Sequence, residues 1–244
     1  MIMTKKVAVI TGGNKGIGLE TARQLGQQGM SVIITSRDAA KGEAAAQELR
    51  SKGLDVESIQ LDVADKASIA TAAETISRKH GHIDVLVNNA GIMIDAFDKA
   101  PSQQTIDVWR KTFDTNVFGV VEVTQALLPL IRKSQAGRIV NVSSILGSMA
   151  ANVDPGSTFY NFKIPAYNIS KSALNAWTVH LAYELRDTNI KVNAAHPGFV
   201  KTDLHGVDAP MTPEQGAETS VRLALLDAAG PHGSFYHGNE VQPW

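Results

Sequence analysis

The chain contains no cysteine among its 244 residues, and this absence removes several kinds of chemistry. Without cysteine there is no disulfide, no thiolate nucleophile and no sulfur ligand for a structural zinc site. The seven histidines show no metal-ligand spacing, so we expect no metal. No apolar run approaches the roughly 18 residues that span a bilayer, and no signal-peptide segment precedes the first apolar run. The sequence therefore predicts a cytoplasmic protein without a membrane contact.

An excess of charge of one sign is also lacking. The 23 lysines and arginines nearly balance the 24 aspartates and glutamates, which gives a net charge of -1. This balance supplies no electrostatic reason to expect nucleic acid or an anionic membrane as partner. The chain also has no Gly-x-Ser-x-Gly sequence, which argues against a hydrolase of that type. We therefore expect a small-molecule partner.

The chain does contain a regular alternation of short apolar runs and longer stretches of helical period. The runs predict strands over residues 7–10, 31–35, 56–61, 83–87, 138–142 and 190–194. Several runs are apolar on both faces, which fits a parallel sheet covered by helices on both sides. No linker divides the chain, although residues 152–157 are predicted as a loop. We expect an α/β fold with a doubly wound, Rossmann-like sheet in one domain over residues 1–244.

A glycine loop follows the first predicted strand and opens a helix predicted to begin near Gly16. The loop runs from Thr11 to Gly18. Its essential glycines are Gly12, Gly16 and Gly18, which have the spacing Gly-x-x-x-Gly-x-Gly. Glycines allow a tight turn and let the backbone approach a pyrophosphate, which the N–H groups at the helix start attract. The loop predicts a dinucleotide site, and a plain tight turn is the alternative interpretation.

The choice of dinucleotide depends on residues about twenty positions further on. Arg37 occurs there and can bind a 2′-phosphate in bidentate fashion, while Lys15 in the glycine loop adds a second cation. Asp38 offers a carboxylate for a ribose hydroxyl, but its position suits the start of the next helix, over residues 39–50. These residues favour NADP(H) over NAD(H). The alternative interpretation of Arg37 is a solvated surface cation without a role in binding.

Motifs along essentially the whole chain resemble those of the short-chain dehydrogenase/reductase superfamily. Besides the glycine loop, they comprise Leu61 to Val63, Asn88 to Gly91, Thr115 with Asn116, Val142 to Ser144, Tyr167 with Lys171, and Pro197 with Gly198 and Thr202. Within the superfamily the chain is most similar to NADPH-dependent carbonyl reductases. The resemblance implies cofactor contacts from Gly12, Asn14, Lys15, Gly16, Ile17, Gly18, Arg37, Asp62, Val63, Asn88, Ala90, Gly91, Tyr167, Lys171, Pro197, Gly198, Val200 and Thr202.

The resemblance also implies a catalytic site of four residues, which assists the transfer of a hydride from NADPH to a ketone or aldehyde. Such a reduction develops negative charge on the carbonyl oxygen, so the site needs a proton donor and a fixed hydrogen bond there. Tyr167 is the expected donor, and Lys171, one helical turn away, is expected to lower the pKa of its phenol. Ser144 is expected to bind the carbonyl oxygen, with Ser143 as the fallback. Asn116 is expected to hold a water that leads to Lys171.

Each catalytic candidate also has a structural explanation, as a packing residue, a solvated cation, a turn residue or a buried amide. Tyr160 and Lys163 form a second tyrosine–lysine pair, but they are three residues apart and Pro165 follows them. The alternative function is a catalytically silent NADP(H)-binding sensor or scaffold. Loss of Tyr167 or Lys171 would mark such a protein, and both are present.

Ser144 and Tyr167 are 23 residues apart, which is longer than usual in the superfamily. Residues 151–165 are therefore interpreted as an inserted loop, and residues 203–217 as a substrate loop. Both loops contribute to a predicted apolar pocket, whose lining is Ile145, Met149, residues 152–165, Phe199 and residues 204–211.

The inserted loop carries the aromatics Phe159, Tyr160 and Phe162, which either roof the pocket or pack on the sheet edge. We expect an apolar or aromatic carbonyl or alcohol as substrate. The insertion and the sequence of residues 233–244 both depart from the tetrameric relatives, so we expect a monomer or a homodimer.

Overall fold

The structure is a computed structural model, and it describes residues 5–204 and 208–244. The described residues contain one sheet with the strand order β3-β2-β1-β4-β5-β6-β7-β8. Its strands are β1 (Val7–Ile10), β2 (Ser31–Ser36), β3 (Val56–Gln60), β4 (Val85–Asn88), β5 (Arg138–Val142), β6 (Lys191–Ala195), β7 (Phe235–His237) and β8 (Glu240–Val241). Only the β7–β8 pair is antiparallel among the named strands. This confirms the predicted parallel sheet.

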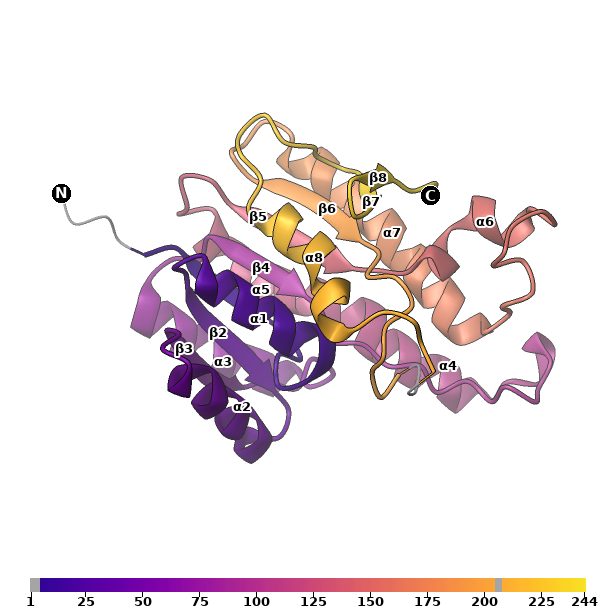
Figure 1. Ribbon diagram of the computed structural model, residues 1–244, viewed down its shortest axis with the longest axis horizontal. Helices are drawn as coiled ribbons and strands as arrows, with labels where there is room; N and C mark the ends of the chain where they lie inside the picture. Colours follow the sequence, from indigo (N-terminus) through magenta and orange to yellow (C-terminus); the bar gives the residue numbers. More distant parts are fainter. Residues whose placement is uncertain (1–4, 205–207) are drawn as a thin grey trace.

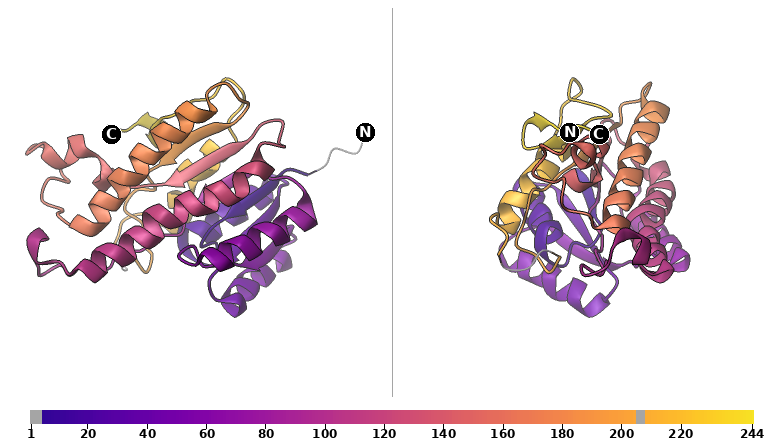
Figure 2. Two further views of the ribbon diagram at one scale, coloured as in Figure 1. Left: turned by 180° about the vertical axis from the view of Figure 1, so that it is seen from behind. Right: turned by 90° about the vertical axis from the view of Figure 1, so that its right-hand side faces the viewer.

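Helices cover both faces of the sheet, as Figures 1 and 2 show. The longer helices are α1 (Gly16–Gln27), α2 (Ala39–Ser51), α3 (Lys66–His80), α4 (Ile106–Phe113), α5 (Gly119–Ile131), α7 (Pro165–Leu185) and α8 (Pro213–Ala224). The short ones are η1 (Pro101–Gln103), η2 (Asp114–Phe118), η3 (Ile145–Gly147) and α6 (Met149–Val153). The architecture is therefore the predicted doubly wound α/β fold.

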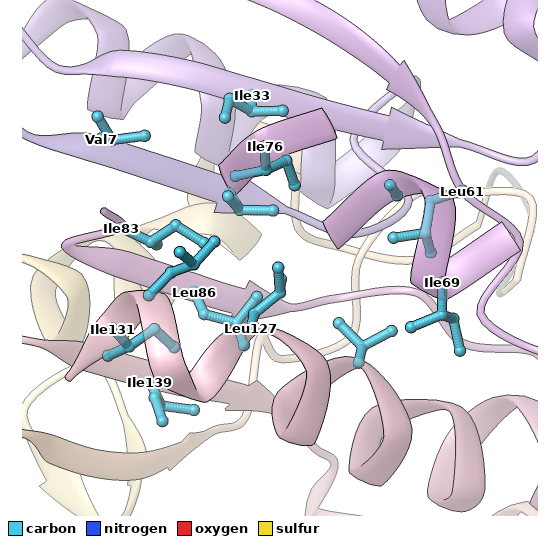
Figure 3. Close-up of a cluster of buried hydrophobic side chains, with 14 of the residues drawn as sticks. Val7, Ile33, Leu61, Ile69, Ile76, Ile83, Leu86, Leu127, Ile131 and Ile139 are labelled. Atoms are coloured by element: carbon cyan, nitrogen blue, oxygen red, sulfur yellow. The ribbon is translucent and has the colours of Figure 1, made fainter. Parts of the chain in front are cut away.

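Two apolar clusters hold the helices to the sheet. One cluster joins the sheet to α3, α5 and α7, and Figure 3 shows part of it, including Ile76, Leu86 and Leu127. The other joins the opposite face to α1, α2 and α8. Successive side chains of a strand point to opposite faces, so Val9 belongs to the first cluster and Ile10 to the second. Both faces of the central strands are buried for this reason.

Several element boundaries differ slightly from those predicted. The fourth strand begins at Val85 instead of residue 83, and the carboxylate of Asp84, just before it, accepts a hydrogen bond from the Val7 N–H. Residues 152–157 are not wholly a loop, since α6 extends to Val153 after Ser148 caps it through the Ala151 N–H. Strands β7 and β8 were not predicted, because three and two residues are too few to show a period. In the described ranges no helix is both long and apolar enough to cross a membrane.

The strand order reverses between β1 and β4, and the loops after these strands meet there. Asn89, after β4, donates to the backbone carbonyls of Thr11 and Gly12, after β1, over 2.9 and 3.2 Å. In open α/β sheets, ligands bind at the carboxyl ends of the strands beside such a reversal. The fold thus brings the predicted glycine loop and the predicted catalytic segments to one edge.

Candidate active site

The glycine loop depends on glycine at several positions. Gly12 and Gly16 have φ angles of 62° and 54°, a region that side chains with a Cβ disfavour. A Cβ at Gly18 would lie 2.4 Å from Asn89 Nδ2, and one at Gly12 would lie 3.1 Å from Ala90 Cα. The loop is therefore packed closely against the residues that follow β4. Asn89, which the sequence did not single out, ties the two segments together.

The start of α1 fits an anionic ligand. Lys15 occupies the position before the helix and makes no side-chain cap, and the first turn contains no acidic residue. The N–H groups of a first helical turn have no partner within the helix, and together with the helix dipole they favour an anion. The residues present thus fit the pyrophosphate of a dinucleotide.

The two cations predicted to bind a 2′-phosphate lie in different surroundings. Arg37 is exposed immediately after β2, beside the start of α2. Asp38 accepts a hydrogen bond from the Lys41 N–H and thereby begins α2, as predicted. Lys15 forms an exposed ion pair with Asp203, so a phosphate would compete with this carboxylate for the ammonium group.

The predicted cofactor contacts after β3 and β4 are partly engaged in local structure. Asp62 Oδ1 accepts a bond of 3.0 Å from the Ala64 N–H, whereas the helix that follows, α3, is capped by Asp65. The neighbouring Val63 is buried, and its carbonyl lies against α5 where Gly119 leaves room. Asn88 points its side chain into the protein, where it donates to Thr124 and Asn141. Asn88 therefore supports the end of the sheet, and Asn89 supports the loop.

The loop after β6 reaches the glycine loop from the other side. A Cβ at Gly16 would lie 3.3 Å from Thr202 Cγ2. Val200 is fully buried and bridges to Met211, while Gly198 has a φ angle of 89°. The predicted cofactor contacts after β6 thus come close to the predicted pyrophosphate site at Thr202. Residues 205–207 of the predicted substrate loop lie outside the described residues.

Tyr167 and Ser144 meet at the carboxyl edge of the sheet. Tyr167 lies in the first turn of α7 and is 4% exposed, and its side chain forms a hydrogen bond with that of Ser144. Ser143 instead donates to Asn175 Oδ1 over 2.6 Å, inside the core. The geometry therefore favours Ser144 over the fallback Ser143 as the residue beside the phenol.

Burial controls the ionisation of both Tyr167 and Lys171. It raises the pKa of Tyr167 to about 12, although the hydrogen bond with Ser144 acts in the opposite direction. Burial also lowers the pKa of Lys171 to about 8. Lys171 Nζ donates to the Val142 carbonyl over 2.8 Å and lies 5.7 Å from the centre of the Tyr167 ring. The expected lowering of the phenol pKa by Lys171 is therefore not observed, because desolvation dominates.

Asn116 is fully buried in η2, a π-helical turn between α4 and α5. Its side chain makes two bonds of 2.8 Å with the backbone of Ile92 and donates to Ser170 Oγ over 3.1 Å. A Cβ at Gly91 would lie 3.4 Å from Asn116 Oδ1 and 3.6 Å from Lys171 Nζ. Gly91 therefore lies between Asn116 and Lys171, within van der Waals reach of both.

The second tyrosine–lysine pair does not reach this group. Tyr160 and Lys163 precede α7, and Lys163 Nζ lies 4.7 Å from the centre of the Tyr160 ring. Lys163 also donates to the Asn152 carbonyl over 2.7 Å. The pair therefore braces the inserted segment. Over the parts of the chain that are described, no group of three or more acidic, histidine or cysteine side chains could hold a metal ion.

Known proteins resemble this chain along most of its length. Residues 6–211 match the family described as short chain dehydrogenase. The chain is 36% identical to short-chain dehydrogenase/reductase 1 of Saponaria officinalis, over 98% of this chain and 96% of that protein. It is also 36% identical to NADPH carbonyl reductase 1 of Homo sapiens, over 98% of each chain.

Solved structures show the same likeness in three dimensions. An NADPH-bound carbonyl reductase from chicken fatty liver superimposes with a TM-score of 0.85 at 28% identity, over 99% of both chains. Salutaridine reductase from Papaver somniferum gives a TM-score of 0.82 at 32% identity, over 95% of this chain and 99% of that one. Sequence and structure agree along nearly the whole length, and the chain therefore belongs to the short-chain dehydrogenase family.

Proposed function

We propose that this protein is an NADPH-dependent reductase that converts a ketone or aldehyde to an alcohol, with Tyr167 as the general acid. The observation that carries this proposal is the buried group of Ser144, Tyr167 and Lys171 beside the glycine loop. Relatives named as NADPH carbonyl reductases support the same cofactor and reaction. Bound NADPH supplies the hydride that reduces the carbonyl carbon.

The residues of the chain then manage the proton and the charge. Ser144 donates a hydrogen bond to the substrate oxygen, and Tyr167 Oη transfers its proton to that oxygen as negative charge develops. The high pKa of Tyr167 keeps the phenol protonated at neutral pH, which is the form that donates. Lys171 and Asn116 both lie beside Gly91, where a water can return the proton. One ketone, one proton and the hydride of NADPH thus give one alcohol and NADP⁺.

The substrate is proposed to be apolar or aromatic. Large apolar side chains that bury little of their surface lie on the segments around the site: Phe97, Met149, Val153, Phe162 and Phe199, each more than half exposed. Figure 1 shows α6 and the segment before α4 extending beyond the carboxyl ends of the strands. An apolar substrate would cover such surface, because ligand sites are lined mostly by apolar and aromatic side chains.

The test is NADPH oxidation with a panel of ketones and aldehydes that differ in size and polarity. We expect wild type to reduce apolar members, Tyr167→Phe to lose activity while still binding NADPH, and Tyr183→Phe to remain active. Tyr183 is the matched control, because it lies on the same helix but is mostly exposed beside Arg186. NADPH binding without turnover of any compound would instead indicate the catalytically silent sensor or scaffold.

A further inference from the structure

The first turn of α7 lacks a cap from its own sequence. Ile164 precedes the helix and has no side chain that can accept a hydrogen bond, and Pro165 occupies the first helical position. The next two N–H groups belong to Ala166 and Tyr167. Such groups have no intrahelical partner, and leaving them buried without an acceptor would be costly. The turn that carries the proposed acid therefore needs an acceptor from elsewhere.

Asp95 provides that acceptor from the segment after β4. Its Oδ1 accepts from the Ala166 N–H over 2.7 Å, and its Oδ2 accepts from the Tyr167 N–H over 3.2 Å. Asp95 is only 6% exposed. A carboxylate this deeply buried is tolerated when it is hydrogen-bonded, and the positive end of a helix dipole favours it further.

Two side-chain amides hold the segment that presents Asp95. Asn116 bonds both backbone polar groups of Ile92, and Gln104 bonds both backbone polar groups of Ala96 over 2.6 and 3.1 Å. Gln104 is itself buried. The segment from Ile92 to Ala96 is therefore fixed on either side of Asp95, as a rigid support requires.

We propose that Asp95 is a positioning residue that fixes the backbone of Tyr167 and so aims its phenol at the substrate oxygen. Asp95 holds the Tyr167 N–H, and the Ser170 hydroxyl donates to the Tyr167 carbonyl over 2.7 Å. Asn116 donates to that same hydroxyl. The ring of contacts thus links the proposed acid to the proposed proton path. This inference rests on the proposed function, because it assumes that Tyr167 is the acid.

The test compares Asp95→Asn and Asp95→Ala with wild type, by hydrogen exchange and by steady-state kinetics. We expect amide exchange at Ala166 and Tyr167 to accelerate in Asp95→Ala. Because small misplacements of a catalytic group are costly, kcat should fall roughly tenfold or more in Asp95→Ala while Kd for NADPH changes less than about twofold. Asp95→Asn keeps one acceptor oxygen, so its kcat should lie between that of wild type and that of Asp95→Ala.

Asp84→Asn is the matched control. Asp84 is also a buried carboxylate, 8% exposed, and its Oδ2 accepts from the Val7 N–H over 2.8 Å, but it lies before β4 instead of after it. We expect this variant to lose stability without any change in kcat or in exchange at Tyr167. A kcat that falls as far in Asp84→Asn as in Asp95→Asn would overturn the proposal.

Unchanged exchange at Tyr167 in Asp95→Ala, or wild-type kcat in that variant when folded, would also overturn it. Faster exchange together with a wild type that reduces no carbonyl compound would support the anchoring and refute the proposed function. If Asp95→Ala fails to fold, Gln104→Ala takes its place, since it frees Ala96 and keeps the carboxylate. Exchange at Tyr167 should then rise, and an unchanged rate would contradict the proposal.

Discussion

At the scale of single residues, burial pushes both Tyr167 and Lys171 toward their neutral forms. The pKa of Tyr167 rises to about 12 and that of Lys171 falls to about 8. A neutral phenol is ready to give a proton, whereas a lysine that titrates near neutral pH can both give and take one. The two shifts have the same cause, but near neutral pH only that of Lys171 costs stability, because the phenol of Tyr167 is neutral there in the folded and the unfolded chain alike.

Replacing Lys171 by methionine should abolish reduction and yet stabilise the protein near neutral pH. The lowered pKa means that folding penalises the ammonium group fully below pH 8, and that the penalty fades as pH rises toward the unfolded value of 10.5. Lys171→Met should therefore raise the free energy of unfolding by about 1 to 3 kcal/mol at pH 7. Urea unfolding at pH 7 and pH 9.5 measures it, with the exposed Lys111→Met as control. If the difference in unfolding free energy between Lys171→Met and wild type were larger at pH 9.5 than at pH 7, this account would be contradicted.

Arg37 and Lys15 should determine the preference for NADPH. Neutral replacements of both remove charge-assisted bonds to a 2′-phosphate, which NADH lacks. We expect KM for NADPH to rise at least about tenfold, and KM for NADH to change far less. Asp203→Asn, which frees Lys15 from its ion pair, should lower KM for NADPH. Equal effects on the two cofactors would exclude the assignment.

At the scale of elements, the inserted segment is braced to α7. Asn168, the residue after Tyr167, donates to the Phe162 carbonyl over 2.7 Å and to Asn152 Oδ1 over 3.4 Å. Asn152 in turn donates to the carbonyls of Leu146 and Ser148. The insertion is therefore tied to the helix that carries the proposed acid, and its conformation bears on the substrate site.

Asn168→Ala should release this segment. The change removes the donor from the partly buried Phe162 carbonyl, which should cost about 0.5 to 1.5 kcal/mol of unfolding free energy. Trypsin should then cut after Lys163 faster than in wild type, while cleavage after the exposed Lys133, beyond α5, should keep its rate. Gel analysis of timed digests measures both. Equal acceleration at the two sites would indicate general unfolding and contradict the local brace.

At the scale of the whole molecule, residues 233–244 are the segment expected to bear on subunit contacts. The Trp244 ring stacks on Phe235 with 5.6 Å between centres, and the Trp244 carbonyl accepts from the Ala150 N–H over 3.2 Å. Residues 233–244 thus pack on their own chain beside α6. We expect a monomer or a homodimer, which sedimentation would show as a mass of 26.1 kDa or twice that value. A mass of four chains would contradict this expectation.

Local signals predicted much of this molecule. The glycines after β1 fix the start of α1, and Asp38 marks the start of α2, because both act on residues close by in the sequence. Long-range partners could not be predicted. Asp95 bonds the Ala166 N–H across 71 positions and Asn89 bonds Thr11 across 78, and spacing does not reveal such pairs. The raised pKa of Tyr167 could not be predicted either, because the sequence does not show how deeply the side chain is buried.

The central claim is that Tyr167 gives the proton as the hydride arrives. The most direct test is a single-turnover measurement with deuterium-labelled NADPH and an apolar ketone, following label into the alcohol. General acids typically contribute about 10²- to 10⁴-fold, so Tyr167→Phe should slow label transfer by at least about 100-fold with Kd for NADPH unchanged. Transfer at the wild-type rate in Tyr167→Phe, with normal NADPH binding, would contradict the account.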